Sequence, residues 1–276
     1  MRPISEQVIL ITGAADGLGA AVAADLAAEG ATLLLHGRSE ARAQEAVDAV
    51  RERTGSDRLR PYHADLASLD EVRRMADAVL DAEPRLDVLV NNAGIGTAHP
   101  GDGRRLESAD GHELRFAVNY LAGYLLTRRL LGLLERSAPA RIVNVASAGQ
   151  MAIDFDDVML EHRYSAGRAY TQSKLAQILF TFDLAEELEG RGVTANCLHP
   201  ATYMPTRMVL AARGSGMSTI REGADATVRL IADPALDGVS GRYFEGTREA
   251  APDRQAFDPD ARRRLRELSA RLTGEG

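Results

Sequence analysis

The sequence predicts an α/β fold: a doubly wound, parallel, seven-stranded sheet with helices on both faces, forming a single domain over residues 1–276. Apolar runs of strand length alternate with amphipathic segments of helix length, which favours strand–helix–strand units and a parallel sheet. The apolar runs are nearly continuous, as expected for strands that are buried on both faces. No repeat or linker divides the chain, and one α/β domain often reaches this length.

The expected elements follow one another in the order that this fold requires. The seven strands are predicted at Val8–Thr12, Thr32–His36, Arg58–His63, Asp87–Val90, Arg141–Val145, Thr194–Leu198 and Arg242–Phe244. The helices are predicted at Leu18–Glu29, Glu40–Arg53, Leu69–Ala82, Glu113–Glu135, Ala169–Glu189, Ile220–Ala232 and 260–273. Loops are expected at 96–110, 150–167 and 201–218. The last two leave the carboxyl ends of strands, where doubly wound sheets bind ligands, so they are either walls of a substrate pocket or plain surface loops.

The composition disfavours several classes of protein. A formal net charge of −7 argues against nucleic-acid binding, because phosphate recognition needs a basic surface. No apolar run reaches the roughly 18 residues that a membrane span needs, and the first residues lack the pattern of an export signal. The single cysteine, Cys197, rules out an internal disulfide and a cysteine-rich metal site. We therefore expect a cytoplasmic protein with no metal, nucleic-acid or membrane partner.

A glycine-rich turn joins the first strand to the first helix, with the sequence Thr12-Gly13-Ala14-Ala15-Asp16-Gly17-Leu18-Gly19. Glycines let the backbone approach a pyrophosphate, and the helix N-terminus offers unpaired N–H groups to the anion. The alternative is a tight turn without a ligand. We therefore predict that this turn holds the pyrophosphate of a dinucleotide cofactor. The residues predicted to contact it are Gly13, Ala15, Asp16, Gly17, Leu18 and Gly19.

The end of the second strand favours NADP(H) over NAD(H). An NAD site usually places a carboxylate there, whereas an arginine can meet a 2′-phosphate. Here the strand ends without a carboxylate and Arg38 follows, although Arg38 could also be an ordinary surface arginine. Asp16 would oppose a 2′-phosphate. Asp65 and Leu66, after the third strand, are predicted to hold the adenine; alternatively, Asp65 caps the next helix.

Lys174 is the only lysine among 33 basic residues. A chain that otherwise uses arginine keeps a lysine where a compact, movable ammonium is needed. Tyr170 lies four residues earlier and therefore on the same helical face. A free tyrosine has a pKa of about 10, and a nearby ammonium lowers that pKa because it favours the phenolate. The pair is thus predicted to form a proton donor.

Taken together, several motifs resemble those of the classical short-chain dehydrogenase/reductase family, from Val8 to about Gly246. They are Thr12-Gly13, Asn91-Asn92-Ala93-Gly94, Asn119, Ser147 and Tyr170-x-x-x-Lys174. The resemblance implies a Rossmann fold and NADP(H)-dependent hydride transfer between an alcohol and a carbonyl carbon. Further cofactor contacts are then expected at Asn91, Ala93, Gly94, Tyr170, Lys174, Pro200 and Thr202.

The resemblance also implies four catalytic roles. Ser147 donates a hydrogen bond to the substrate oxygen, and Tyr170 gives that oxygen its proton. Lys174 also holds the nicotinamide ribose, and Asn119 anchors a water that relays protons to Lys174.

Three details resemble the retinol dehydrogenase-like branch: the long Ser147-to-Tyr170 separation, the acidic insertion at 154–157 and the late segment 265–269. This implies a bulky, largely apolar ketone or aldehyde as substrate, with a place in secondary metabolism as one option. The long helices pair between subunits in many relatives, so a homodimer and a homotetramer both stay open. One departure is Pro200-Ala201 where the family often has Pro-Gly, which leaves the nearby contacts of Thr202 open.

Two other functions remain open at this stage. The same site could perform a non-redox or internally redox step, such as an epimerisation, in which the cofactor is not consumed. A cofactor-sensing protein without activity is the other alternative. The retained Tyr170 and Lys174 pair argues against it.

Overall fold

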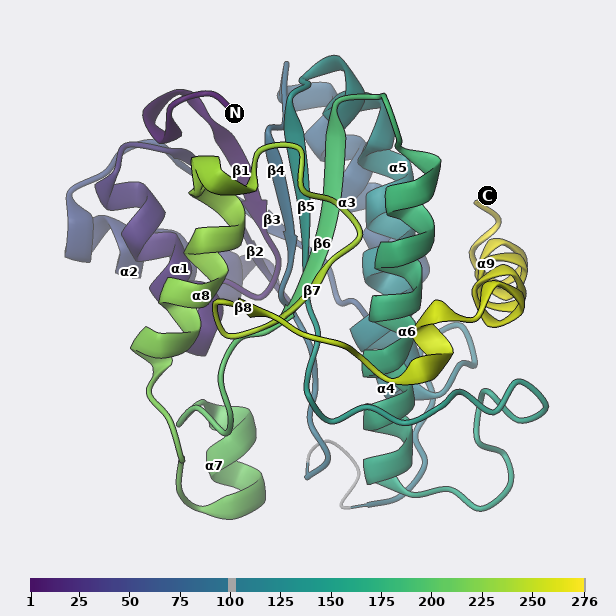
Figure 1. Cartoon of the computed structure of the whole chain (residues 1–276). Coiled ribbons are helices and arrows are strands. Elements are labelled where there is room, and N and C mark those ends of the chain that lie inside the picture. Colours follow the sequence, from purple (N-terminus) through teal and green to yellow (C-terminus); the bar gives the residue numbers. More distant parts are fainter. Residues whose placement is uncertain (99–102, 276) are drawn as a thin grey trace.

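The computed structural model describes residues 1–98 and 103–275, and a twisted sheet forms its centre (Figure 1). The strand order is β3-β2-β1-β4-β5-β6-β7-β8. Strands β1 to β7 pair in parallel, and the chain builds outward first on one side of β1 and then on the other. The direction changes between β1 and β4, and ligands of doubly wound sheets bind at the carboxyl ends of strands beside such a point.

The strands are β1 Val8–Ile11, β2 Thr32–Gly37, β3 Leu59–His63, β4 Val88–Asn91, β5 Ala140–Val145, β6 Val193–His199, β7 Tyr243–Glu245 and β8 Arg248–Glu249. The helices are α1 Gly17–Ala28, α2 Glu40–Thr54, α3 Leu69–Ala82, α4 Leu114–Phe116, α5 Ala122–Arg136, α6 Ala166–Glu187, α7 Arg207–Arg213, α8 Ile220–Ala232 and α9 Pro259–Thr273. The predicted fold class is confirmed, and each of the seven predicted strands is present.

Three features correct the sequence-based prediction. The sheet has eight strands rather than seven, because β8 turns back and pairs with β7 in antiparallel orientation. The predicted loop 201–218 contains the helix α7. The long helical region expected at about Glu113–Glu135 is present, but between α4 and α5 it contains a π-helical turn at Ala117–Leu121 that the sequence did not predict. Residues 99–102 of the predicted loop 96–110 lie outside the described residues.

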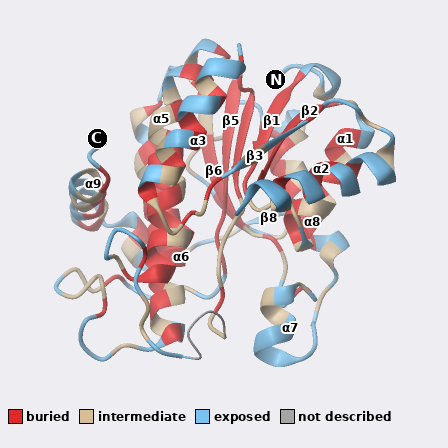
Figure 2. Ribbon diagram, turned by 180° about the vertical axis from the view of Figure 1, so that it is seen from behind, coloured by how far each residue is buried: buried red, intermediate tan, exposed pale blue. Residues whose placement is uncertain are grey.

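Two apolar layers sandwich the sheet. Helices α1, α2 and α8 cover one face, and α3, α5 and α6 cover the other (Figure 1). Alternate residues of each strand point to opposite faces. In β1, Ile9 and Ile11 pack with the first helix layer, whereas Leu10 packs with the second. The central strands are therefore buried throughout, as Figure 2 shows in red.

The C-terminal helix α9 packs outside the second layer, against α6 (Figure 1). Leu265 is its fully buried apolar contact. The Tyr120 hydroxyl lies 2.6 Å from the Ser269 hydroxyl, and the Tyr124 hydroxyl donates to the carbonyl oxygen of Glu275 at 3.0 Å. Part of the outer face of the long helices is thus covered by the chain itself. No helix in the described part of the chain has the length and apolar run that a bilayer crossing requires.

A buried histidine joins the glycine turn to the end of β3. The Gly13 N–H donates to Nδ1 of His36 at 3.0 Å, so the ring proton lies on Nε2, which is 3.0 Å from the carbonyl oxygen of Ala64. Burial lowers the pKa of His36 from 6.5 to about 4. The neutral ring therefore holds the turn in place.

The pKa of His36 predicts a loss of stability in weak acid. The unfolded chain takes up the proton near pH 6.5 and the folded protein only near pH 4. The contribution of neutral His36 to the free energy of unfolding is therefore fully present above about pH 6.5 and decreases as the pH falls toward 4. Between pH 7 and pH 5 the free energy of unfolding should fall by about 2 kcal/mol from this group.

Urea denaturation at the two pH values measures this change. In His36→Asn the amide oxygen can still accept from Gly13, and the variant should be less stable at pH 7 but lose less stability on acidification. An equal loss in both proteins would show that His36 is not the group responsible.

Candidate active site

Two polar side chains tie the turn after β1 to the end of β4. The Thr12 hydroxyl accepts from the backbone N–H groups of Asn92 at 2.9 Å and Ala93 at 3.1 Å. The Asn92 side chain in return donates to the carbonyl oxygens of Thr12 at 2.8 Å and Gly13 at 3.1 Å. The glycine turn and the Asn-Asn-Ala-Gly segment are therefore fixed side by side at the point where the sheet changes direction.

Only glycine fits at two positions of this turn. A Cβ on Gly19 would lie 2.2 Å from the carbonyl oxygen of Gly13, and a Cβ on Gly13 would lie 2.9 Å from Cα of Ala93. Asp16 precedes the first residue of α1 and makes no side-chain hydrogen bond to the helix end. The N-terminal N–H groups of α1 are thus not capped by Asp16, as an anion-binding turn requires.

The charges around the turn favour an anionic ligand more than the sequence suggested. The Asp16 carboxylate is paired with Arg42 at 2.9 Å and with Arg207 at 3.4 Å. The two guanidinium groups partly offset the Asp16 charge, and the effect of Asp16 on a 2′-phosphate stays a prediction. Arg38 is exposed in the turn between β2 and α2.

The segment after β3 differs in part from the prediction. The cap of α3 is Ser68, whose hydroxyl accepts from the Glu71 N–H, so Asp65 is not the helix cap. Asp65 instead accepts from the Ala67 N–H at 3.0 Å and shapes the turn. The Leu66 side chain is buried in the core. Adenine contacts by Asp65 and Leu66 stay predictions.

Ser147 and Tyr170 meet above the carboxyl end of β5. A Cβ placed on Gly149 would lie 3.4 Å from Oγ of Ser147 and 3.8 Å from Cε1 of Tyr170. Ser147 lies just beyond β5, and Tyr170 lies in the second turn of α6. The Ser147 oxygen accepts from the Gly149 N–H at 3.0 Å, so its own hydrogen can be donated to another oxygen.

Lys174 lies in the same place and is almost fully buried, with 4% of its surface exposed. Its Nζ donates to the carbonyl oxygen of Val145 at 2.9 Å and to Oε1 of Gln177 at 2.8 Å. The same Nζ is 5.9 Å from the ring centre of Tyr170. A Cβ on Gly94 would lie 3.6 Å from it. The ammonium therefore borders both Tyr170 and the segment after β4.

Burial dominates the proton affinities of this pair. It lowers the pKa of Lys174 to about 7. It also raises the pKa of Tyr170, which a hydrogen bond from Ser147 opposes only in part. Burial is thus the largest influence on the Tyr170 pKa, and the expected lowering by the Lys174 ammonium stays a prediction. The Lys174 Nζ directs its hydrogen bonds to Val145 and Gln177, and desolvation of the phenolate raises the pKa of Tyr170.

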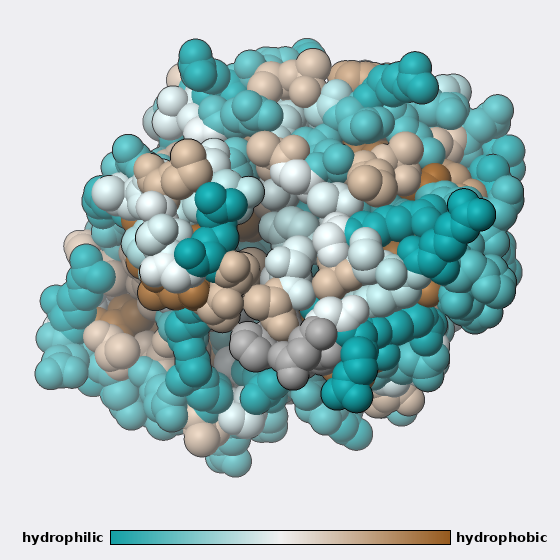
Figure 3. Space-filling model, turned by 90° about the horizontal axis from the view of Figure 1, so that it is seen from below, coloured by the Kyte–Doolittle hydropathy of each residue, from teal (hydrophilic) through white to brown (hydrophobic). Residues whose placement is uncertain are grey.

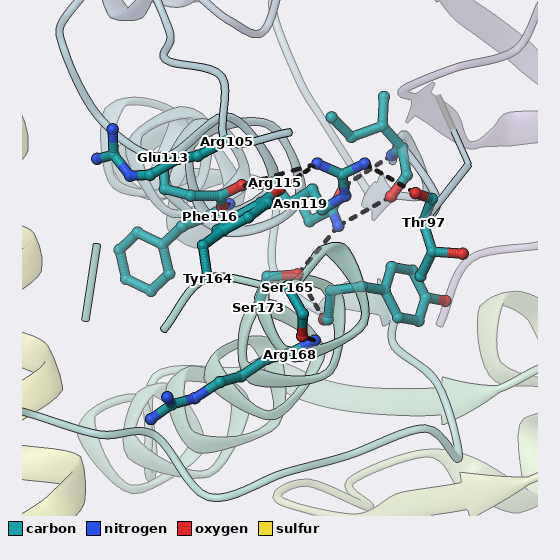
Figure 4. A network of polar contacts seen from close by, with 12 residues as sticks. Thr97, Arg105, Glu113, Arg115, Phe116, Asn119, Tyr164, Ser165, Arg168 and Ser173 are labelled. Carbon is teal, nitrogen blue, oxygen red and sulfur yellow. Dashed lines mark hydrogen bonds and ion pairs between the residues drawn. The ribbon is translucent and has the colours of Figure 1, made fainter. Parts of the chain in front are cut away.

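Asn119, in the π-helical turn, holds two elements together (Figure 4). Its Oδ1 accepts from the Ile95 N–H at 2.7 Å, and its Nδ2 donates to Ile95 O at 3.1 Å and to Ser173 Oγ at 3.0 Å. The Ser173 hydroxyl donates to the carbonyl oxygen of Tyr170 at 2.7 Å. Asn119 thus joins the segment after β4 to α6, and its predicted water relay stays a prediction.

The arrangement agrees with the similarity of the chain to known proteins. A sequence model described as short chain dehydrogenase matches residues 7–214. The chain belongs to the short-chain dehydrogenase family. It is accordingly an oxidoreductase that acts on alcohol and carbonyl groups.

A relative and two solved structures resemble this dehydrogenase. Human retinol dehydrogenase 14 is 38% identical, over 97% of this chain and 86% of that protein. A protein from Mycobacterium paratuberculosis, 30% identical, has a TM-score of 0.79 and covers 98% of this chain and 94% of its own. A short chain dehydrogenase from Shigella flexneri, complexed with NADP, has a TM-score of 0.71 at 25% identity and covers 88% of this chain and 98% of its own.

The side chain of Asn91 in this dehydrogenase does not face the glycine turn as a cofactor contact would. Its Nδ2 donates to Thr127 Oγ1 at 3.0 Å and to Asn144 Oδ1 at 2.8 Å, inside the core. Asn144 in turn donates to Thr181 at 2.8 Å. The Asn91 side chain therefore points into the layer of α5 and α6, and the predicted cofactor contact of Asn91 stays a prediction.

A buried cluster of Glu113, Arg115 and Tyr164, which we call the Arg115 cluster, joins two loops of the dehydrogenase (Figure 4). Arg115 is fully buried and donates to the carbonyl oxygens of Gly96 at 2.8 Å and Thr97 at 3.1 Å. It also donates to the Tyr164 hydroxyl at 2.8 Å, which is 3.4 Å from the Glu113 carboxylate. The loop after β4 is thereby tied to the segment that leads into α6.

Sequence reasoning missed the Arg115 cluster. The available signal was a charged residue within the otherwise apolar stretch that follows Glu113. Burial raises the pKa of Glu113 and of Tyr164. Glu113 also accepts from the Phe116 N–H at 2.7 Å, so both groups have the hydrogen-bond partners that buried polar groups need.

The predicted substrate loops lie on the face beyond the carboxyl ends of the strands, which Figure 3 shows with apolar side chains in tan and brown among hydrophilic ones in teal. In the loop 201–218, Thr206 packs on the glycine turn, where a Cβ on Gly17 would lie 3.1 Å from its methyl group. Met208 packs against Gly96 in the same way. The exposed large apolar residues of the two loops are Met151, Tyr203, Leu210 and Met217.

The residues predicted after β6 are only partly brought to the site. Pro200 is buried, and Thr202 is exposed with its hydroxyl 3.1 Å from Nε2 of His199. Cofactor contacts by both stay predictions. Among the described residues, a groove of about 1080 Å³ lies at the amino end of β6. It lies at the opposite end of the strands from Ser147, so volume does not locate the candidate site.

The Arg115 cluster predicts a specific loss of stability. Tyr164→Phe removes the oxygen that accepts from buried Arg115, and the free energy of unfolding should fall by roughly 1–3 kcal/mol. Urea denaturation measures this loss. Tyr203→Phe is the control, because Tyr203 is exposed and its hydroxyl should contribute less than about 0.5 kcal/mol. Equal effects of the two variants would contradict the role of the cluster.

Proposed function

We propose that this dehydrogenase is an NADP(H)-dependent carbonyl reductase or alcohol dehydrogenase that acts on a bulky, largely apolar ketone or aldehyde. The observation that carries the proposal is the meeting of Ser147, Tyr170 and Lys174 beside the glycine turn. These three groups can bind a substrate oxygen, give it a proton and hold a positive charge nearby.

The residues around the glycine turn fit a nicotinamide dinucleotide. Gly13 and Gly19 allow a close backbone turn in which a Cβ would collide with Ala93 or with Gly13, and α1 begins within this turn at Gly17. A preference for the 2′-phosphate is supported by exposed Arg38 and by the neutralisation of Asp16 through Arg42 and Arg207. The similar structure from Shigella flexneri is a complex with NADP, which is in line with this proposal. When bound, the nicotinamide supplies or accepts the hydride.

Three side chains of the protein bind the substrate oxygen and supply its proton. In the reductive direction, Ser147 donates a hydrogen bond to the carbonyl oxygen. The Tyr170 hydroxyl then gives its proton to the alkoxide that forms. Lys174, when protonated, stabilises the phenolate that remains. Burial around this group strengthens each of these interactions, because little water is present to screen them.

An apolar substrate is supported by the two loops beyond the strand ends. Their exposed large apolar side chains, Met151, Tyr203, Leu210 and Met217, border the face where the substrate must enter. The name of the human relative, retinol dehydrogenase 14, points to an apolar alcohol. A bulky ring ketone or a long-chain aldehyde is therefore a better first substrate than a sugar.

The cofactor preference can be tested with one arginine. NADPH should be preferred over NADH by at least about tenfold in kcat/KM, since one charge-assisted contact supplies that much free energy. Arg38→Ala should remove most of this preference and leave NADH use unchanged. Arg53→Ala, at the exposed far end of α2, is the matched control. Unchanged NADPH use by Arg38→Ala would place the 2′-phosphate contact elsewhere.

The proton donor can be tested with one hydroxyl. Tyr170→Phe should lower kcat by at least about 100-fold, because it removes the general acid. Nicotinamide absorbance with a panel of bulky ketones and aldehydes measures the rate and also shows whether the cofactor is consumed. Tyr62→Phe is the control, since its hydroxyl binds Glu83 far from the site. An active Tyr170→Phe would refute the assignment.

A further inference from the structure

Gln177 holds Lys174 from the core side of α6. It lies three residues further along this helix, and its Oε1 accepts from the Lys174 Nζ at 2.8 Å. The other acceptor of that ammonium is the carbonyl oxygen of Val145 at 2.9 Å. A backbone carbonyl cannot be changed by mutation, so Gln177 is the side chain through which the sequence can adjust Lys174.

Burial of the Gln177 amide costs desolvation free energy unless the amide makes hydrogen bonds. Only 4% of its surface is exposed. It borders a cavity of about 10 Å³ together with Asn91, Asn119 and mainly apolar residues. A leucine would occupy this position without the desolvation cost of an amide. Close packing therefore does not explain a glutamine here, whereas the hydrogen bond to Lys174 does.

The backbone of Gln177 is also fixed. Its carbonyl oxygen accepts from the Thr181 hydroxyl at 2.7 Å, and Thr181 accepts from Asn144 at 2.8 Å. Asn144 accepts from Asn91 in β4 at 2.8 Å. This buried chain of hydrogen bonds connects α6 to β5 and β4. The glutamine oxygen is thereby presented to Lys174 from a rigid support.

Few titratable groups surround Lys174. Tyr170 faces it from α6. His199 faces it from β6, and burial lowers the pKa of this histidine so that it is neutral near pH 7. The segment after β4 and the π-helical turn contribute Gly94 and Asn119, which carry no charge. The acceptors that the described residues offer to the Lys174 ammonium, Val145 O and Gln177 Oε1, are uncharged, so an apolar or a carboxylate side chain at position 177 would directly change the electrostatics of the ammonium.

We propose that Gln177 is a positioning residue that fixes the direction of the Lys174 ammonium and its proton affinity, and thereby sets the pH range of the reaction. The inference rests on the proposed function, because it takes Lys174 as part of the proton-donating pair. Removing the acceptor should weaken the charged form of Lys174, and a carboxylate in its place should strengthen it.

The test is the pH dependence of kcat for ketone reduction with NADPH. The rate should fall at high pH with an apparent pKa that belongs to the Tyr170–Lys174 pair. Gln177→Leu should lower this apparent pKa by about one unit, and Gln177→Glu should raise it by a similar amount. Gln177→Asn keeps an amide and should give an intermediate profile. A purely structural role would lower kcat without opposite shifts.

Controls separate the possible failures. Gln172→Leu makes the same chemical change on α6, but Gln172 binds Arg168 rather than Lys174. The apparent pKa of its kcat profile should therefore equal that of the wild type. Gln177→Glu has the size of the wild-type side chain and carries the test alone if Gln177→Leu does not fold. The inference would be overturned if the apparent pKa of the kcat profile did not change in the Gln177 variants, or if Gln177→Leu and Gln177→Glu changed it in the same direction. If Tyr170→Phe is also active, the proposed function itself fails.

Discussion

The burial of a single ammonium group governs the candidate site. Lys174 has almost no exposed surface and donates to Val145 and Gln177. Desolvation brings its pKa to about 7, so small changes in its partners alter its charge near neutral pH. The proton donor Tyr170 depends on this charge, because its own burial raises its pKa. The surrounding fold can be understood as the support that keeps the ammonium in place.

That support crosses the sheet as a line of buried polar groups. Thr127, Asn91, Asn144 and Thr181 connect α5, β4, β5 and α6 beneath the site. Above it, Asn119 and the Arg115 cluster join the loop after β4 to the start of α6. Each side chain of this line makes at least one buried hydrogen bond, and such bonds are stronger in the low dielectric of the core than in water. The layers of apolar side chains provide stability, and these networks determine where the reacting groups lie.

The sequence predicted the features that depend on local pattern. Continuous apolar runs identify buried parallel strands, and the spacing of Tyr170 and Lys174 places both on one face of α6. Features that depend on three-dimensional surroundings were missed or wrong. The polar partners of the Asn91 side chain, the pairing of Asp16 with two arginines and the burial that raises the pKa of Tyr170 were not predicted, because all three arise from contacts distant in sequence. Helix α7 and strand β8 are too short to give a periodic signal.

The ionisation of Lys174 is the most direct test of this account. Because the chain contains one lysine, protein labelled with ¹³C and ¹⁵N in lysine gives a single side-chain NMR signal, and its titration reports this group alone. The account predicts a midpoint near pH 7 for the cofactor-free protein. A midpoint near the value of about 10.4 for an exposed lysine would contradict it, because the ammonium would then not be buried as described.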